Sequence, residues 1–145
     1  MNAMEKLDEI LFYTLEKSIK TYRKYAQSKI KSKGFDITID QWLVLKTLQE
    51  NNHIPQNQIA EKVFKDMASI TRIIEILVQK KYIKRKSNAS DRRKFDLEIS
   101  ELGIGIIQDI HPIVIENRKQ ALKGLKQEEV KILKMHLEKL IHNCE

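Results

Sequence analysis

The spacing of apolar residues predicts a chain built mainly from α-helices. Apolar side chains recur at steps of three and four residues over most of the sequence, and this period places them on one face of a helix. Four glycines and two prolines are few turn formers for 145 residues, which favours long helices over a many-stranded barrel or sandwich. The predicted helices cover residues 4–33, 38–51, 56–64, 67–81 and 127–142, with a further one that begins near residue 101 and ends before Gly124.

Several residues at the predicted helix starts have side chains that cap helices well. Thr38 or Asp40 is expected to cap the second helix, and Asp66 and Ser100 are expected to cap two later ones. Their side-chain oxygens can accept hydrogen bonds from the free amide groups of a first turn. Gly34 is expected to end the first helix.

A period of two residues replaces the helical period after residue 82. Residues 95–99 alternate apolar and acidic side chains, as a strand with one buried face does, and residues 83–86 are predicted to be its partner. The polar residues between them predict the turn of an antiparallel hairpin. Two short helices with a tight connection, followed by such a hairpin, form a winged helix-turn-helix. The expected fold class is therefore mainly α, with a small β component.

The excess positive charge is concentrated in one segment. The chain has a formal net charge of +7, and residues 80–94 hold eight basic residues and one acidic residue, so this segment carries the whole excess. Solubility does not need such a concentration, because interspersed charges serve it equally well. A partner that carries many phosphates is bound by concentrated positive charge, since each phosphate that a basic residue neutralises releases condensed counterions. The segment predicts binding to nucleic acid, with an ordinary lysine-rich loop as the alternative.

The start of the 67–81 helix and the tip of the hairpin supply the candidate DNA contacts. In a winged helix-turn-helix the second helix presents its N-terminal side chains to base edges in the major groove, where hydroxyl and guanidinium groups bind bases or phosphates. The predicted DNA-binding residues are Met67, Ala68, Ser69, Thr71 and Arg72 on the helix and Arg92, Arg93 and Lys94 on the hairpin. Asp91 is interpreted as a wing-supporting residue that holds an arginine or caps the turn, because a carboxylate would repel phosphate.

Five sequence blocks at these positions resemble the MarR family of bacterial winged-helix regulators. They are Gln-Ile-Ala-Glu at 58–61, Ser-Ile-Thr-Arg-Ile-Ile at 69–74, Lys-Tyr-Ile-Lys-Arg at 81–85, Ser-Asp-Arg-Arg at 90–93 and Leu-Glu-Ile-Ser-Glu-Leu-Gly at 97–103. Each block is weak alone, whereas the Asp-Arg-Arg wing at this distance from the Thr-Arg helix is fairly specific. The family usually has glycine where Tyr82 stands, so the turn before the wing is expected to be made differently.

The resemblance implies a homodimeric, sequence-specific transcription regulator, in the first place a ligand-responsive repressor. Residues 1–145 are expected to form a single domain, with dimerisation helices at about 4–33 and 101–143 and a DNA-binding lobe at about 38–100. The implied partners are double-stranded DNA with a pseudo-palindromic operator and a small aromatic or phenolic effector. The alternative is a non-sequence-specific nucleic-acid-binding or architectural protein, and a small-molecule carrier without DNA activity is a third interpretation.

Three aromatic residues are candidates for a ligand pocket between the first helices and the DNA-binding lobe. They are Tyr13, Tyr22 and Trp42. Aromatic residues at helical spacing are more often part of a core, so core packing is the alternative interpretation of the same side chains.

The sequence argues against several other classes of protein. It has no glycine-rich phosphate loop, no nucleophile elbow and no cysteine and histidine with the sequence signature of a catalytic dyad, so we expect neither an enzyme nor catalytic residues. No two of the four histidines are spaced four residues apart on one helix, so we expect neither a metal nor another cofactor. Only short apolar runs and no signal sequence are found, which predicts a cytoplasmic protein without membrane contact.

Overall fold

The computed structural model describes residues 4–88, 90–91 and 95–145, and it has the winged helix-turn-helix arrangement that the sequence predicts. The elements are η1 (Leu7–Glu9), α1 (Leu11–Ser32), α2 (Ile39–Glu50), α3 (Gln56–Lys62), α4 (Met67–Gln79), β1 (Ile83–Ser87), β2 (Phe95–Ile99), α5 (Glu101–Ala121) and α6 (Gln127–Cys144). The first helix begins later than predicted. Residues 7–9 form a separate 3₁₀ turn, and Ile10 is extended (φ −85°, ψ 121°), which separates that turn from α1.

Capping side chains fix the starts of α2 and α5. Thr38 Oγ1 accepts a hydrogen bond from Gln41 N (3.0 Å), and Gln41 Oε1 accepts one from Thr38 N (3.1 Å). Ser100 Oγ accepts a hydrogen bond from Gly103 N at 3.0 Å. These bonds satisfy amide groups that a first turn leaves free, and they show that Thr38, rather than Asp40, caps α2.

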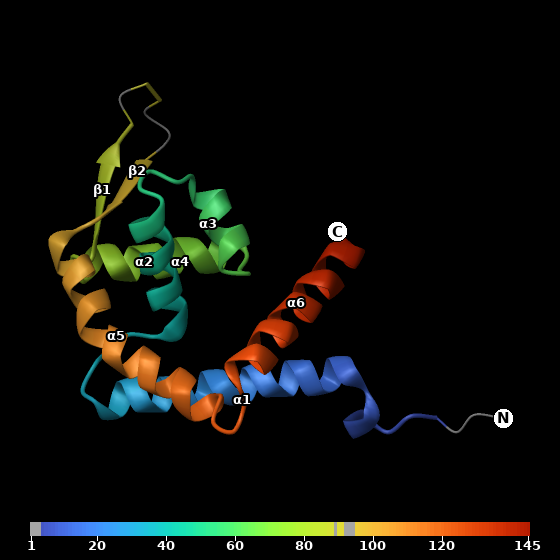
Figure 1. The fold of residues 1–145 in the computed structure, drawn as a ribbon. Coiled ribbons are helices and arrows are strands. Elements are labelled where there is room, and N and C mark those ends of the chain that lie inside the picture. Colours follow the sequence, from blue (N-terminus) through green and yellow to red (C-terminus); the bar gives the residue numbers. More distant parts are fainter. Residues whose placement is uncertain (1–3, 89, 92–94) are drawn as a thin grey trace.

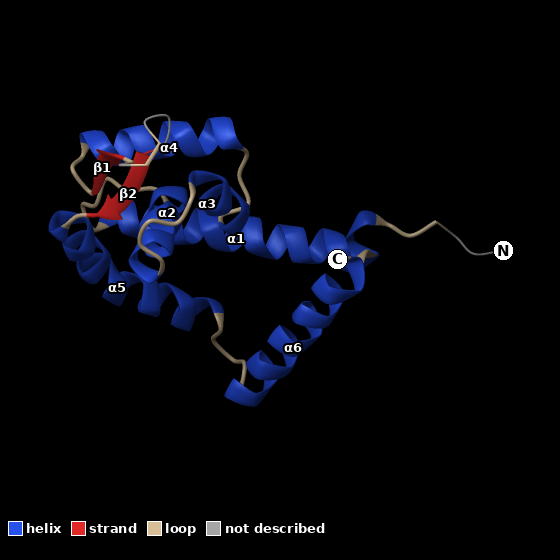
Figure 2. Ribbon diagram, turned by 90° about the horizontal axis from the view of Figure 1, so that it is seen from above, coloured by secondary structure: helices blue, strands red, loops and turns tan. Residues whose placement is uncertain are grey.

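One hydrophobic core joins the helix-turn-helix to the hairpin. The largest fully buried side chains are Val44, Leu45, Leu48, Ile59, Ile70, Ile74, Leu77 and Ile110. Figure 1 shows α2, α3, α4 and the hairpin gathered in one lobe, from which α5 leads to α1. Figure 2 shows the two strands beside the C-terminal end of α4. The strands are antiparallel with Lys84 opposite Glu98, and the ion pair between them joins Lys86 Nζ to a carboxylate oxygen of Glu98 at 3.9 Å.

The chain leaves α4 through a left-handed residue. Lys81 has a φ of 66°, its N–H donates to Val78 O (2.9 Å), and Tyr82 N donates to Leu77 O (2.9 Å). This pair of bonds is the Schellman closure of a helix, whose left-handed position is usually glycine. The turn before the wing therefore has its left-handed residue at Lys81, one position earlier than the resemblance indicates.

The apolar stripes of α1 and α6 are largely exposed in the single chain. α6 contains no buried residue, and α1 buries only Ala26 and Ile30. Leu11 and Ile19, which belong to the predicted buried face of the first helix, are both more than half exposed. Figure 1 shows α6 extending away from the lobe. Such uncovered apolar stripes are typical of surfaces that another molecule covers.

Among residues 4–88, 90–91 and 95–145, no helix combines the length and the apolar character needed to cross a bilayer.

Candidate DNA-binding surface and ligand cavity

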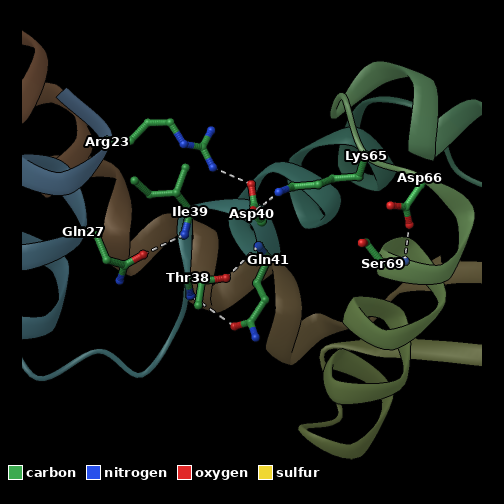
Figure 3. Close-up of polar contacts among 9 residues, drawn as sticks. All are labelled: Arg23, Gln27, Thr38, Ile39, Asp40, Gln41, Lys65, Asp66 and Ser69. Carbon is green, nitrogen blue, oxygen red and sulfur yellow. Dashed lines mark hydrogen bonds and ion pairs between the residues drawn. The ribbon is translucent and has the colours of Figure 1, made fainter. Parts of the chain in front are cut away.

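The N-terminus of α4 is fixed by Asp66, the residue that the sequence predicts as its cap. Asp66 Oδ1 accepts a hydrogen bond from Ser69 N at 2.7 Å (Figure 3). Hydrogen bonds from the amide and the hydroxyl of Ser69 hold the pKa of Asp66 below its ordinary value, and the positive charge of Lys65 acts in the same direction. The carboxylate is therefore charged at neutral pH, where it complements the positive end of the helix dipole.

The α4 side chains that are predicted to contact DNA lie mainly on its exposed side. Met67, Ala68, Thr71 and Arg72 are exposed, and Ser69 is half-buried. The apolar face of α4 packs in or against the core through Ile70, Ile73, Ile74, Leu77 and Val78. The helical period thus predicts correctly which face of α4 is free, whereas its contact with DNA stays a prediction.

The hydroxyl of Thr71 is already engaged within the protein. Thr71 Oγ1 donates to Met67 O (2.9 Å) and accepts a hydrogen bond from Gln56 Nε2 (2.7 Å). Gln56 is the first residue of α3, so this contact joins the two helices of the helix-turn-helix. The contact of Gln56 with Thr71 cannot be predicted from the sequence, because a polar residue at a helix start gives no sign of a partner fifteen residues away.

Part of the positive segment is neutralised at the base of the wing. Glu75 Oε1 on α4 lies 3.3 Å from both terminal nitrogens of Arg85, and this contact ties α4 to β1. Lys80 Nζ lies 3.5 Å from a carboxylate oxygen of Asp36. At least two of the eight basic residues in segment 80–94 thus face carboxylates. The charge that is free to meet a phosphate backbone is therefore smaller than the formal count.

The turn of the wing is organised by Asn88. Its carboxamide oxygen accepts hydrogen bonds from Ser90 N (2.8 Å) and Asp91 N (3.2 Å). Asn88 therefore caps the turn, and both roles predicted for Asp91, capping the turn and holding an arginine, stay predictions. An asparagine at the start of a polar turn is a known signal for this motif, and the sequence analysis overlooked it. The predicted contacts Arg92, Arg93 and Lys94 lie outside the described residues.

A cavity of about 220 Å³ lies between α1, α2 and α5. Two of the three predicted pocket residues, Tyr22 and Trp42, line it. Tyr13 lines a different groove along α1, together with Lys17 and Lys20, so the structure does not bring it together with the other two. An engineered apolar cavity of about 150 Å³ binds benzene, so the cavity beside Trp42 has room for a ligand with one aromatic ring.

The wall of this cavity also carries polar groups, from Arg23, Asn117 and Arg118. Trp42 Nε1 is buried and has no hydrogen-bond partner among the described residues. A buried donor without a partner is unfavourable for the isolated chain. The sequence analysis missed the three polar wall residues, because nothing local distinguishes them from the many other polar residues of α1 and α5.

Charged contacts lead from this cavity to the helix-turn-helix (Figure 3). Arg23 Nη2 lies 2.5 Å from Asp40 Oδ1, and Asp40 Oδ2 lies 3.2 Å from Lys65 Nζ. Lys65 directly precedes Asp66, the cap of α4. The Arg23–Asp40–Lys65 network therefore joins α1, the first turn of α2 and the turn before α4.

Two consecutive helices, α3 and α4, followed by an antiparallel hairpin beside the C-terminal end of α4, define a protein of the winged helix-turn-helix class. A model of the MarR family matches residues 37–95. The HTH-type transcriptional regulator MhqR of Bacillus subtilis (strain 168) is 30% identical to the chain over 122 residues, which span 84% of the chain and 83% of that relative. The chain therefore belongs to the MarR family, whose members are transcriptional regulators.

Two solved structures share the fold over almost their whole length. Bordetella bronchiseptica BpsR, whose DNA binding is regulated by 6-hydroxynicotinic acid, has a TM-score of 0.85 at 19% identity, with 95% of this chain and 97% of that chain covered. A mutant of E. coli MarR complexed with operator DNA has a TM-score of 0.83 at 21% identity, with 94% of this chain and 99% of that chain covered. At these identities the likeness establishes a common fold.

Proposed function

We propose that this protein is a dimeric, sequence-specific DNA-binding regulator and a ligand-responsive repressor of transcription. The observation that carries the proposal is the exposed start of α4, which Asp66 fixes, on a helix whose Glu75 contacts Arg85 of the basic strand β1. A helix end in this position enters the major groove in winged helix-turn-helix proteins. The E. coli MarR mutant that shares the fold was solved with operator DNA, which supports the same partner here. We propose no catalytic activity.

The exposed stripes of α1 and α6 support a dimer. Residues 1–145 would form one domain, in which helices within 4–33 and 101–143 pair with those of a second copy and carry the lobes at 38–100. Two α4 helices would then enter successive major grooves, about 34 Å apart. A two-fold dimer reads a pseudo-palindromic operator, because each half-site meets the same side chains.

Selection of bound duplexes from a random pool, followed by substitution of Arg72, tests this proposal. Arg72→Ala is expected to weaken binding to the selected operator by about tenfold or more, because a guanidinium that binds guanine or phosphate at the helix start is lost. Binding to random duplex is expected to weaken less. Lys31→Ala removes the same charge from an exposed position on α1 and serves as the control. The affinities are measured by fluorescence anisotropy at fixed salt concentration.

The same selection experiment distinguishes the proposed sequence-specific regulator from a protein that binds DNA without sequence preference. A sequence-specific regulator prefers its operator over scrambled duplex by about three decades or more. A flat preference across sequences, with equal losses for both variants on every duplex, would contradict the proposal and support a non-sequence-specific architectural protein.

We further propose that the cavity beside Trp42 binds a small aromatic effector that carries an acidic or phenolic oxygen. Arg23 and Arg118 supply positive charge to the wall, and Tyr22 and Trp42 supply aromatic surface. An anion there would compete with Asp40 for Arg23 and so disturb the contact between Asp40 and Lys65 beside the start of α4. A coupling of about 1–3 kcal/mol between effector and DNA is typical of such linkage. The regulation of BpsR by 6-hydroxynicotinic acid supports this type of effector.

The single tryptophan of the chain gives a direct signal for this cavity. We expect at least one compound among benzoate, salicylate and 6-hydroxynicotinic acid to change Trp42 fluorescence and to weaken operator binding by about 5–150-fold. Asp40→Asn should keep the fluorescence change and lose most of the effect on DNA, because the Arg23–Asp40–Lys65 network is broken. Asp36→Asn, the same chemical change outside the network, should keep both. A response of Asp40→Asn equal to that of the wild type would exclude this route of coupling.

A further inference from the structure

Phe64 has a backbone conformation that is unfavourable for its residue type. It follows α3 with a φ of 61°. Its N–H donates to Glu61 O (3.3 Å), and Lys65 N donates to Ala60 O (2.9 Å), which is a Schellman closure with Phe64 at the left-handed position. Glycine occupies such positions without steric conflict, whereas a bulky aromatic residue there is an outlier.

Burial of the ring does not compensate for this strain, because the side chain of Phe64 does not pack in the core. It is 91% exposed, whereas Phe35 packs against the core of the same lobe. Both the backbone and the ring of Phe64 are therefore unfavourable in the isolated chain. Strain of this kind persists where the surrounding structure imposes it, and it is concentrated at functional positions.

Phe64 lies close to the N-terminal end of α4, the part of the molecule that is proposed to contact DNA. The turn between α3 and α4 lies at the N-terminal end of α4 (Figure 1), and Phe64 is two residues before the cap Asp66. The neighbouring Lys65 is held by Asp40 in the Arg23–Asp40–Lys65 network. Met67, the first residue of α4, is also exposed, so two large apolar side chains flank the cap at the tip of the proposed recognition helix.

We infer that Phe64 is a specificity-determining residue, whose ring contacts the C5-methyl group of a thymine in the major groove. This inference rests on the proposed DNA-binding function. The methyl group of thymine is the apolar feature that base edges present in the major groove, and phenylalanine is among the side chains that contact it. The contact would remove the ring from water in the complex, which gives the exposed aromatic a favourable environment that the free protein lacks.

The test compares the wild type with Phe64→Gly on the selected operator. Each thymine is replaced in turn by deoxyuridine, which removes only the methyl group. We expect one thymine per half-site at which the wild type loses about fourfold in affinity and Phe64→Gly loses nothing. On the unmodified operator Phe64→Gly should bind about tenfold or more weakly than the wild type, while its melting temperature is equal or higher because glycine relieves the strain.

His53→Gly is the matched control, because His53 also has a left-handed φ (63°) and an exposed side chain, and it lies outside the basic segment 80–94. It should show a similar gain in melting temperature and keep the deoxyuridine profile of the wild type. An unchanged profile in Phe64→Gly, with the operator still preferred, would overturn the inference alone. A change in the dimer dissociation constant of Phe64→Gly would overturn it in favour of a contact between subunits. A wild type without any sequence preference would overturn both the proposed function and this contact.

Discussion

Replacing Leu133 with glutamate is expected to convert the proposed dimer into monomers at micromolar concentration. Leu133 lies on the exposed apolar stripe of α6 and is 46% exposed in the single chain. A carboxylate placed in an apolar interface must lose its hydration without gaining a partner, which is strongly unfavourable. A monomer contacts one half-site only, so operator affinity should fall by about a thousandfold. Sedimentation equilibrium and operator titration measure the two effects.

Lys131→Glu provides the control on the same helix. Lys131 is exposed and lies on the opposite side of α6 by helical spacing, so its replacement adds a carboxylate outside the apolar stripe. It should leave the dimer intact. Dimers of unchanged dissociation constant in Leu133→Glu would show that this stripe of α6 does not form the subunit interface.

The second large effect is expected at Gly103, where α5 passes against the turn after α4. A Cβ atom on Gly103 would lie 2.4 Å from Tyr82 O and 2.8 Å from Ile99 Cγ1. Because one of these atoms belongs to the backbone, the two elements must move apart. We expect Gly103→Ala to lower the free energy of unfolding by about 3 kcal/mol, at the upper end of the usual range for overpacking. Denaturant unfolding at equal protein concentration measures the change.

Gly105→Ala tests whether this loss comes from packing or from the loss of a glycine as such. Gly105 lies two residues further along α5, and a Cβ atom there would have no neighbour within 4 Å. Alanine favours a helix over glycine, so Gly105→Ala should raise the free energy of unfolding by about 0.5–1 kcal/mol. A loss of stability in both variants would contradict the explanation by close approach at Gly103.

The sequence predicts those parts of the fold that depend on local signals. The caps Thr38, Asp66 and Ser100 and the inward face of α4 follow from residue type and period, since each acts within one or two turns. The start of α1 was predicted too early, because the helical spacing continues through Ile10, where the backbone is extended.

The sequence predicts the exposed face of α4 and part of the cavity lining, but not the contacts that join distant segments of the chain. The free face of α4 was found, and Tyr22 and Trp42 do share a cavity, while Tyr13 lies elsewhere. The Arg23–Asp40–Lys65 network joins residues 17 and 25 positions apart, and no sequence period relates such positions. The strain at Phe64 cannot be predicted from the sequence either, because apolar residues are common at helix ends. Only the backbone angle φ distinguishes Phe64 from them.

The position of α5 has a consequence for how an effector would change operator choice. At one end Ser100 Oγ donates to Lys81 O (2.6 Å), directly after α4, and near the other end Asn117 lines the cavity and donates to Ala26 O on α1 (3.5 Å). A shift of α5 at the cavity would therefore also reach the turn between α4 and the wing, and it would add a smaller contribution to the disturbance of the Arg23–Asp40–Lys65 network. The separation of the two α4 helices in the proposed dimer would then change, which favours a different number of base pairs between the half-sites.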